Sequence, residues 1–135
     1  MSHVTLVTAG VLLLCVVTIE YGGLFLLSIH RGKAPLTDFQ KAFFRAGHAH
    51  AGVLVILSLV MLPYCDAAGV GGLLAAIARY GVPLAAILMP MGFFFAAIGP
   101  GLEKPNGLLP LVYVGAASLA GGVLCLGIGL ILKAF

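Results

Sequence analysis

The sequence predicts an all-α integral membrane protein, with four transmembrane helices in a compact antiparallel bundle. The first observation is composition, because 62% of the residues are hydrophobic and only 8% are charged. A soluble domain of similar length carries about 25% charged residues, so this chain has too few polar side chains to cover a globule. The second observation is the presence of four apolar runs, each long enough for a bilayer span of about 20 residues.

The four apolar runs define the predicted spans, which together form a single transmembrane domain over residues 1–135. The backbone must satisfy its own hydrogen bonds in lipid, and strand-like alternation is absent, so each span is expected to be helical. Pro63 is expected to end the second span, whereas residues 64–79 fit a loop, an interfacial helix or part of the third span. The predicted spans cover residues 4–29, 39–62, 80–98 and 108–132.

Two of the spans contain residues that are expected to shape their packing. Pro83 and Pro90 lie inside the third span and predict a kink near its centre. The fourth span is rich in small residues, which let helices approach closely in a membrane. These small residues are Gly115, Ala116, Ala117, Ser118, Ala120, Gly121 and Gly122.

The loops between the spans carry the information on topology. Thr37 or Asp38 is expected to cap the second span. The basic residues near the first and third loops are Arg31, Lys33, Lys41 and Lys104, whereas the opposite side holds Arg79 and Lys133. The positive-inside rule therefore favours cytoplasmic loops and places both termini on the outer side. The expected location is the inner (plasma) membrane of a bacterium.

The candidate site begins with three polar residues inside the second span, Arg45, His48 and His50. Ionisable side chains in hydrocarbon are costly, and they are functional candidates by default. If the first two spans form a hairpin around the first loop, His48 lies level with Tyr21 and close to Glu20. All of these side chains then lie near the bilayer midplane, at about 1.5 Å of rise per residue.

The polar side chains at this depth are expected to point in different directions. Successive helical residues are rotated by about 100°, so His48 and His50 point about 200° apart. His48 shares a polar stripe with Arg45, and this stripe is expected to meet Glu20 and Tyr21. His50 is expected to face another helix, another subunit or a cofactor. The predicted proton, ion or substrate site consists of Glu20, Tyr21, Arg45, His48 and His50.

The function that this site favours is proton-linked transport, or a channel, for a small ion or solute. Histidine titrates near neutrality, so His48 and His50 can pass or sense protons together with Glu20. A homo-oligomer is expected, because four spans enclose little space. This interpretation involves no cofactor, and it makes enzymatic activity the less favoured class. No basic cluster indicates nucleic-acid binding.

Three alternatives stay open from the sequence. In the first, the protein is a membrane redox protein in which His48 or His50, with Met89 or Met91, ligates haem iron or copper. In the second, it is a non-catalytic membrane subunit that packs against a larger complex. In the third, Glu20 and Arg45 form a buried ion pair whose only role is to fix the helix register.

Overall fold

The computed structural model describes all 135 residues, and it consists of four α-helices joined by three connections. All four helices are long and apolar enough to cross a membrane by length and composition. The prediction of an all-helical fold with four apolar helices packed together is therefore confirmed. The helices are α1 (His3–His30), α2 (Asp38–Ala68), α3 (Gly72–Ala96) and α4 (Pro110–Ala134).

The largest difference from the predicted bounds lies between the second and third helices. Helix α2 continues through Pro63 to Ala68, because a proline costs little where neighbouring helices support the backbone. The helix ends instead at Gly69, which adopts the left-handed conformation (φ +65°) that suits glycine. Helix α3 then begins at Gly72, so residues 64–79 are mainly helical. Residues 97–109 form the connection from α3 to α4, which is the longest of the three connections.

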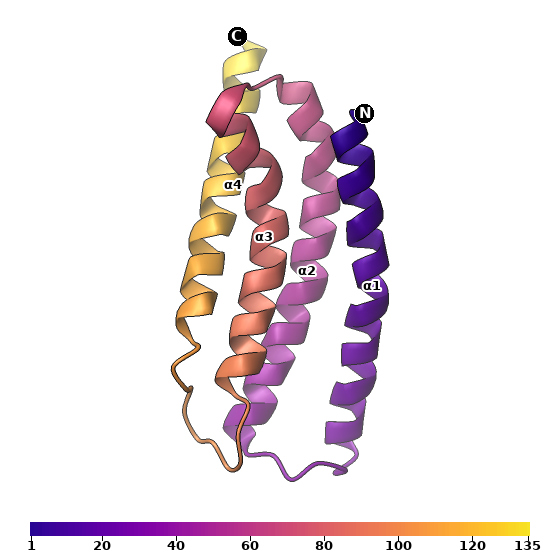
Figure 1. Ribbon diagram of the computed structural model, residues 1–135, viewed down its shortest axis with the longest axis vertical. Coiled ribbons are helices and arrows are strands. Elements are labelled where there is room, and N and C mark those ends of the chain that lie inside the picture. Colours follow the sequence, from indigo (N-terminus) through magenta and orange to yellow (C-terminus); the bar gives the residue numbers. More distant parts are fainter.

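The helices lie across the molecule in the order α4, α3, α2, α1, with both termini at one end and the two longer loops at the other (Figure 1). Helix α3 packs against both α2 and α4, and α2 also contacts α4. Helix α1 packs mainly against α2, and most of its large apolar side chains are exposed. The molecule is thus a three-helix core with α1 attached to α2, and the four helices do not surround one common core.

Helices α3 and α4 approach closely because glycines meet at their interface. A Cβ added to Gly81 would lie 2.7 Å from the Cα of Gly122, and one added to Gly115 would lie 2.5 Å from the side chain of Met89. The Ser118 hydroxyl donates a hydrogen bond of 2.8 Å to the Gly81 carbonyl across this contact. The prediction that small residues of the fourth helix allow close packing is confirmed.

The start of α2 is fastened to the loop that joins α3 to α4. Thr37 caps α2 in a capping box with Gln40, which confirms Thr37 as the predicted cap. The buried Gln40 amide donates hydrogen bonds of 2.9 Å to the Ala97 carbonyl and 2.8 Å to the Gly99 carbonyl. The Thr37 hydroxyl donates to the Leu102 carbonyl. These bonds hold the two loops of this end together.

Candidate functional site

A cavity of about 370 Å³ lies between α1, α2 and α3. It forms where α1 rests on α2 but makes little contact with α3, so that the three helices leave a space between them. Ten of its sixteen lining residues are hydrophobic. The lining includes Cys15, Thr18 and Gly22 from α1, His48 from α2, and Pro83, Pro90, Met91 and Phe94 from α3. His48 is the only histidine in the cavity wall, and no Asp, Glu, Lys or Arg accompanies it.

The imidazole of His48 lies against two glycines of α1. A Cβ added to Gly22 would lie 3.4 Å from the His48 Nδ1 atom, and one added to Gly23 would lie 3.4 Å from Cε1. Gly22 and Gly23 follow directly after Tyr21, the residue predicted to lie level with His48. The predicted register of His48 against α1 is therefore correct to within one or two residues, and the glycines provide the room that the ring occupies.

The ring of His48 has no hydrogen-bond partner within the chain. No fully buried side-chain nitrogen or oxygen lacks such a partner, so the ring nitrogens retain some exposed surface, and His48 belongs to the cavity wall. The neighbouring Thr18 hydroxyl already donates a hydrogen bond of 2.6 Å to the Cys15 carbonyl. His48 is thus the main polar group in an apolar wall.

His50 lies outside this cavity. Its Nδ1 atom is 2.7 Å from the carbonyl oxygen of Ala46, one turn earlier in α2. Its ring lies on Phe93 of α3, with 4.9 Å between the ring centroids and 31° between the planes. The rotation of about 200° between two such positions on a helix accounts for this separation from His48.

Glu20 and Tyr21 also lie away from the cavity, on the outer side of α1. Both residues are exposed, and Tyr21 retains 76% of its surface. The two ion pairs of the chain are Lys41–Asp38 and Arg79–Asp66, so the pair between Glu20 and Arg45 that the sequence left open is not formed. The physical reason is the rotation of α1, which turns its glycines and not Glu20 toward α2.

Arg45 is exposed and belongs to a second, smaller pocket, which it shares with Lys41 and with His30 of α1. The structure therefore divides the predicted polar stripe of α2. Lys41 and Arg45 lie toward the loop end of the molecule, whereas His48 lies in the cavity between α1, α2 and α3.

The two methionines proposed as metal ligands lie in different places. Met91 lines the cavity with His48, whereas Met89 is buried beneath Gly115 at the interface between α3 and α4. No group of three or more His, Cys, Asp or Glu side chains is arranged to hold a metal ion. The only predicted His–Met combination that shares one wall is His48 with Met91.

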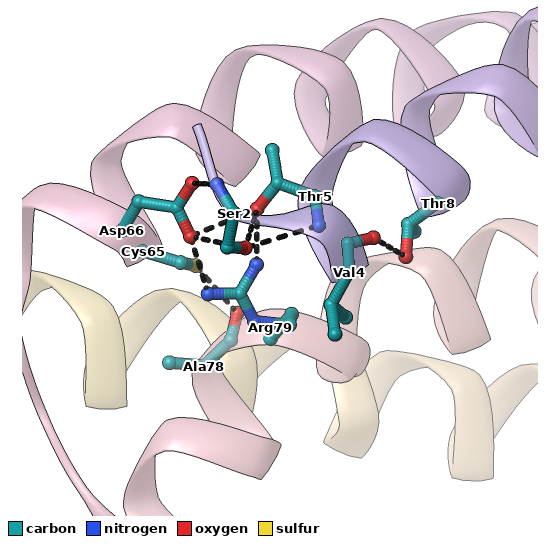
Figure 2. A network of polar contacts seen from close by, with 8 residues as sticks. All are labelled: Ser2, Val4, Thr5, Thr8, Cys65, Asp66, Ala78 and Arg79. Carbon is teal, nitrogen blue, oxygen red and sulfur yellow. Dashed lines mark hydrogen bonds and ion pairs between the residues drawn. The ribbon is translucent and has the colours of Figure 1, made fainter.

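A polar network that the sequence analysis did not identify joins α1, α2 and α3 at the end where the termini lie (Figure 2). Arg79 Nη2 is 2.7 Å from Asp66 Oδ1, and the same oxygen accepts hydrogen bonds of 2.9 Å from the hydroxyls of Ser2 and Thr5. The Ser2 backbone N–H donates to the other carboxylate oxygen at 2.7 Å, and Arg79 also donates to Thr5. The feature of the sequence that could have indicated this network is the presence of one acidic and one basic residue on either side of the glycine-rich link at 69–72.

This network lies next to one end of the cavity. Thr5 precedes Thr8 by about one helical turn, and Arg79 precedes Pro83 by about one turn, and both Thr8 and Pro83 line the cavity. The side chains of Arg79 and Asp66 are only 17% and 19% exposed. The network therefore connects the same three helices that form the cavity, at the end nearer the termini.

Comparisons with known proteins add no function to this geometry. Neither a family model nor a curated protein nor a solved structure matches the chain. The function is therefore inferred from the cavity, His48 and the charged groups themselves.

Proposed function

We propose that the chain is a multi-pass integral membrane protein that moves a small, mainly apolar solute in a proton-linked manner. The four long apolar helices support the membrane location, and we propose the plasma membrane of a bacterium. The cavity between α1, α2 and α3 is the proposed solute site, and His48 is the proposed titrating group.

The observation that carries the proposal is the chemistry of the cavity wall. Binding sites for small molecules are typically about 300–1,000 Å³ in volume, mainly apolar, and oriented by a few polar groups. The cavity of about 370 Å³ fits this description, with His48 as its main polar group. The matching solute is a small apolar molecule with one acidic or hydrogen-bonding group, which the imidazole can contact.

The proton link follows from the position of His48. Histidine changes charge near neutral pH, and the charged form attracts an acidic group whereas the neutral form suits an apolar one. Helix α3 adds a possible source of movement, because Pro83 and Pro90 both line the cavity and each removes a backbone hydrogen bond from the helix. A change of charge on His48 can thus alter both solute binding and the position of α3.

Proton entry into proteoliposomes tests this proposal. Vesicles that contain the protein and the internal pH dye pyranine are placed in a more acidic buffer, so that protons are driven inward. The rate is measured with and without a panel of small aromatic and aliphatic acids and alcohols. We expect at least one solute to accelerate acidification beyond the rate in protein-free vesicles. His48→Gln should abolish this acceleration, whereas His50→Gln and Glu20→Gln should retain it.

The two control variants separate this site from the site expected from the sequence. His50 faces Phe93, and Glu20 lies on the outer side of α1, so neither side chain contacts the cavity. Wild-type acceleration in His48→Gln would contradict the proposal. Loss of acceleration in Glu20→Gln with retention in His48→Gln would return the site to the outer side of α1.

A second candidate function, a haem-binding redox protein, is favoured by the shared wall of His48 and Met91. His48 and Met91 would hold the haem iron, and the haem would supply electron transfer. A spectrum of the purified protein before and after dithionite tests this candidate. A Soret band that shifts on reduction, is lost in His48→Ala, and changes position in Met91→Leu but not in Met89→Leu supports haem. A featureless spectrum removes this candidate.

A further inference from the structure

A second pocket, of about 220 Å³, lies between the end of α1 and the beginning of α2. Only five residues line it, and three of them carry basic side chains. Leu26, Ile29 and His30 come from α1, and Lys41 and Arg45 come from α2. The pocket is thus a basic recess with an apolar wall, quite unlike the cavity between α1, α2 and α3.

The positive charge of this pocket is only partly neutralised by the chain, through Asp38. Arg45 forms no ion pair, because the two ion pairs of the molecule involve other residues. Lys41 is paired with Asp38 at 3.1 Å, but the Asp38 side chain is fully exposed and Lys41 is 40% exposed. Such a solvent-exposed pair is weak, so Lys41 can exchange it for a better anion. No carboxylate lines the pocket itself.

The depth of Arg45 matches the border between hydrocarbon and lipid headgroups. Helix α2 has 31 residues, which corresponds to about 46 Å, whereas the hydrocarbon core is about 30 Å thick. About 8 Å of helix therefore projects into the headgroup region at each end if the excess is shared equally. Arg45 lies about 10 Å from the start of α2. Its long side chain can extend back to the headgroup level while its stem remains among apolar groups.

We propose that this pocket binds the phosphate of an anionic phospholipid. The Arg45 guanidinium can hold two phosphate oxygens at once, and Lys41 and His30 add further donors. Leu26 and Ile29 provide the apolar wall that the glycerol and the first acyl carbons require. Basic pockets between membrane helices are suited to such headgroups.

The apolar part of the pocket favours a lipid over free phosphate. A hydrated phosphate ion would need polar contacts on all sides, and the pocket offers them only from its basic side chains. The absence of a carboxylate also favours an anionic headgroup over a zwitterionic one, whose cationic part would have no partner. The proposal requires only the membrane location and does not depend on solute transport through the cavity between α1, α2 and α3.

Lipid binding to the detergent-purified full chain tests the proposal. Native mass spectrometry and thermal unfolding are measured with phosphatidylglycerol, phosphatidylcholine or inorganic phosphate as the added probe. We expect phosphatidylglycerol to bind and to raise the melting temperature more than the other two probes. Arg45→Gln should weaken phosphatidylglycerol binding by about tenfold or more, as expected for loss of a bidentate charged contact. Arg31→Gln, in the exposed loop, is the matched control and should weaken it much less.

Two further measurements keep the test decisive. Arg45→Lys retains the charge but not the planar fork, so its affinity should fall between those of the wild type and Arg45→Gln. If Arg45→Gln fails to fold, Lys41→Gln combined with His30→Gln replaces it.

Equal binding of both lipids, or an unchanged affinity in Arg45→Gln, would overturn the proposal. Stabilisation by inorganic phosphate as large as that by the lipid would replace the lipid with a free anion. Neither readout involves proton flux, so failure here and failure of the proposed transport are distinguishable.

Discussion

Gly81 of α3 lies so close to Gly122 of α4 that Gly81 has no room for a side chain. A Cβ on Gly81 would lie 2.7 Å from the Gly122 Cα and 2.7 Å from the Ser118 carbonyl oxygen. We expect Gly81→Ala to lower the free energy of unfolding by about 1–3 kcal/mol, the usual cost of overpacking. Thermal unfolding in detergent measures it. Gly127→Ala, in α4, is the control, because its added Cβ meets nothing within 4 Å. Equal melting temperatures for both variants would contradict the close contact.

At the same scale, the register of His48 against α1 could be predicted, but the direction of the site residues on α1 could not. His48 lies beside Gly22 and Gly23, close to the predicted level, because the first loop sets the hairpin register. His48 and His50 also point apart as helical geometry requires. Helix α1, however, is apolar almost all round, so its sequence holds no stripe that indicates which side faces α2. Glu20 was therefore placed inward, whereas it is exposed.

At the scale of the element, α1 depends on the network of Ser2, Thr5, Asp66 and Arg79 for its attachment to α3. Helix α1 otherwise packs mainly on α2, so these polar contacts hold its first turn in place. Cys65 lies beside this network, buried, with its thiol 3.5 Å from the Ala78 carbonyl oxygen. The thiol of Cys65 therefore reports on opening at this end of the molecule.

We expect Asp66→Asn to increase the rate at which maleimide labels Cys65. The substitution removes the charge that holds Arg79 and weakens the hydrogen bonds that fix the first turn of α1. Labelling is followed by mass spectrometry in a background where Cys15 and Cys125 are replaced by alanine. Asp38→Asn is the control, because its carboxylate is exposed at the opposite end. A labelling rate that is equal in all three proteins would show that the network does not hold α1.

The number of helices was predictable, but the end of α2 and the start of α3 were not. Apolar run length identified all four helices, and Thr37 correctly marked the start of α2. Pro63 indicated an end that does not occur, because a helix packed against its neighbours tolerates the loss of one backbone bond. The true end depends on Gly69 in the left-handed conformation, and several nearby glycines could have served equally well.

At the scale of the whole molecule, α1 forms one wall of the cavity and is held mainly by its contact with α2. The sequence predicts a homo-oligomer, and this stays a prediction. We expect the protein in a detergent micelle to have at least twice the mass of one chain. Light scattering corrected for bound detergent measures this mass, and Gly127→Ala, which changes no contact within the chain, serves as the reference variant. A mass of one chain at every protein concentration would contradict the oligomer.

The topology of the molecule decides which aqueous phase each of its ends faces. Both termini and the Asp66–Arg79 network lie at one end, and both longer loops lie at the other (Figure 1). The loop end holds Arg31, Lys33, Lys41 and Lys104, so the positive-inside rule predicts that this end is cytoplasmic. Alkaline phosphatase fused to the C-terminus should therefore be active in a bacterial host, and green fluorescent protein at the same place should be dark.

Removing loop charges tests the physical cause of this orientation. A variant with Lys33→Gln and Lys104→Gln leaves Arg31, Lys41 and Arg45 at the loop end, against Arg79 and Lys133 at the opposite end, so the charge difference between the two ends falls from three basic residues to one. We expect part of the protein to invert, so that phosphatase activity falls and green fluorescence appears. Conversely, a fluorescent, phosphatase-inactive wild type would place the loops and the Arg45 pocket on the outer side. The proposed phospholipid would then have to come from the outer leaflet.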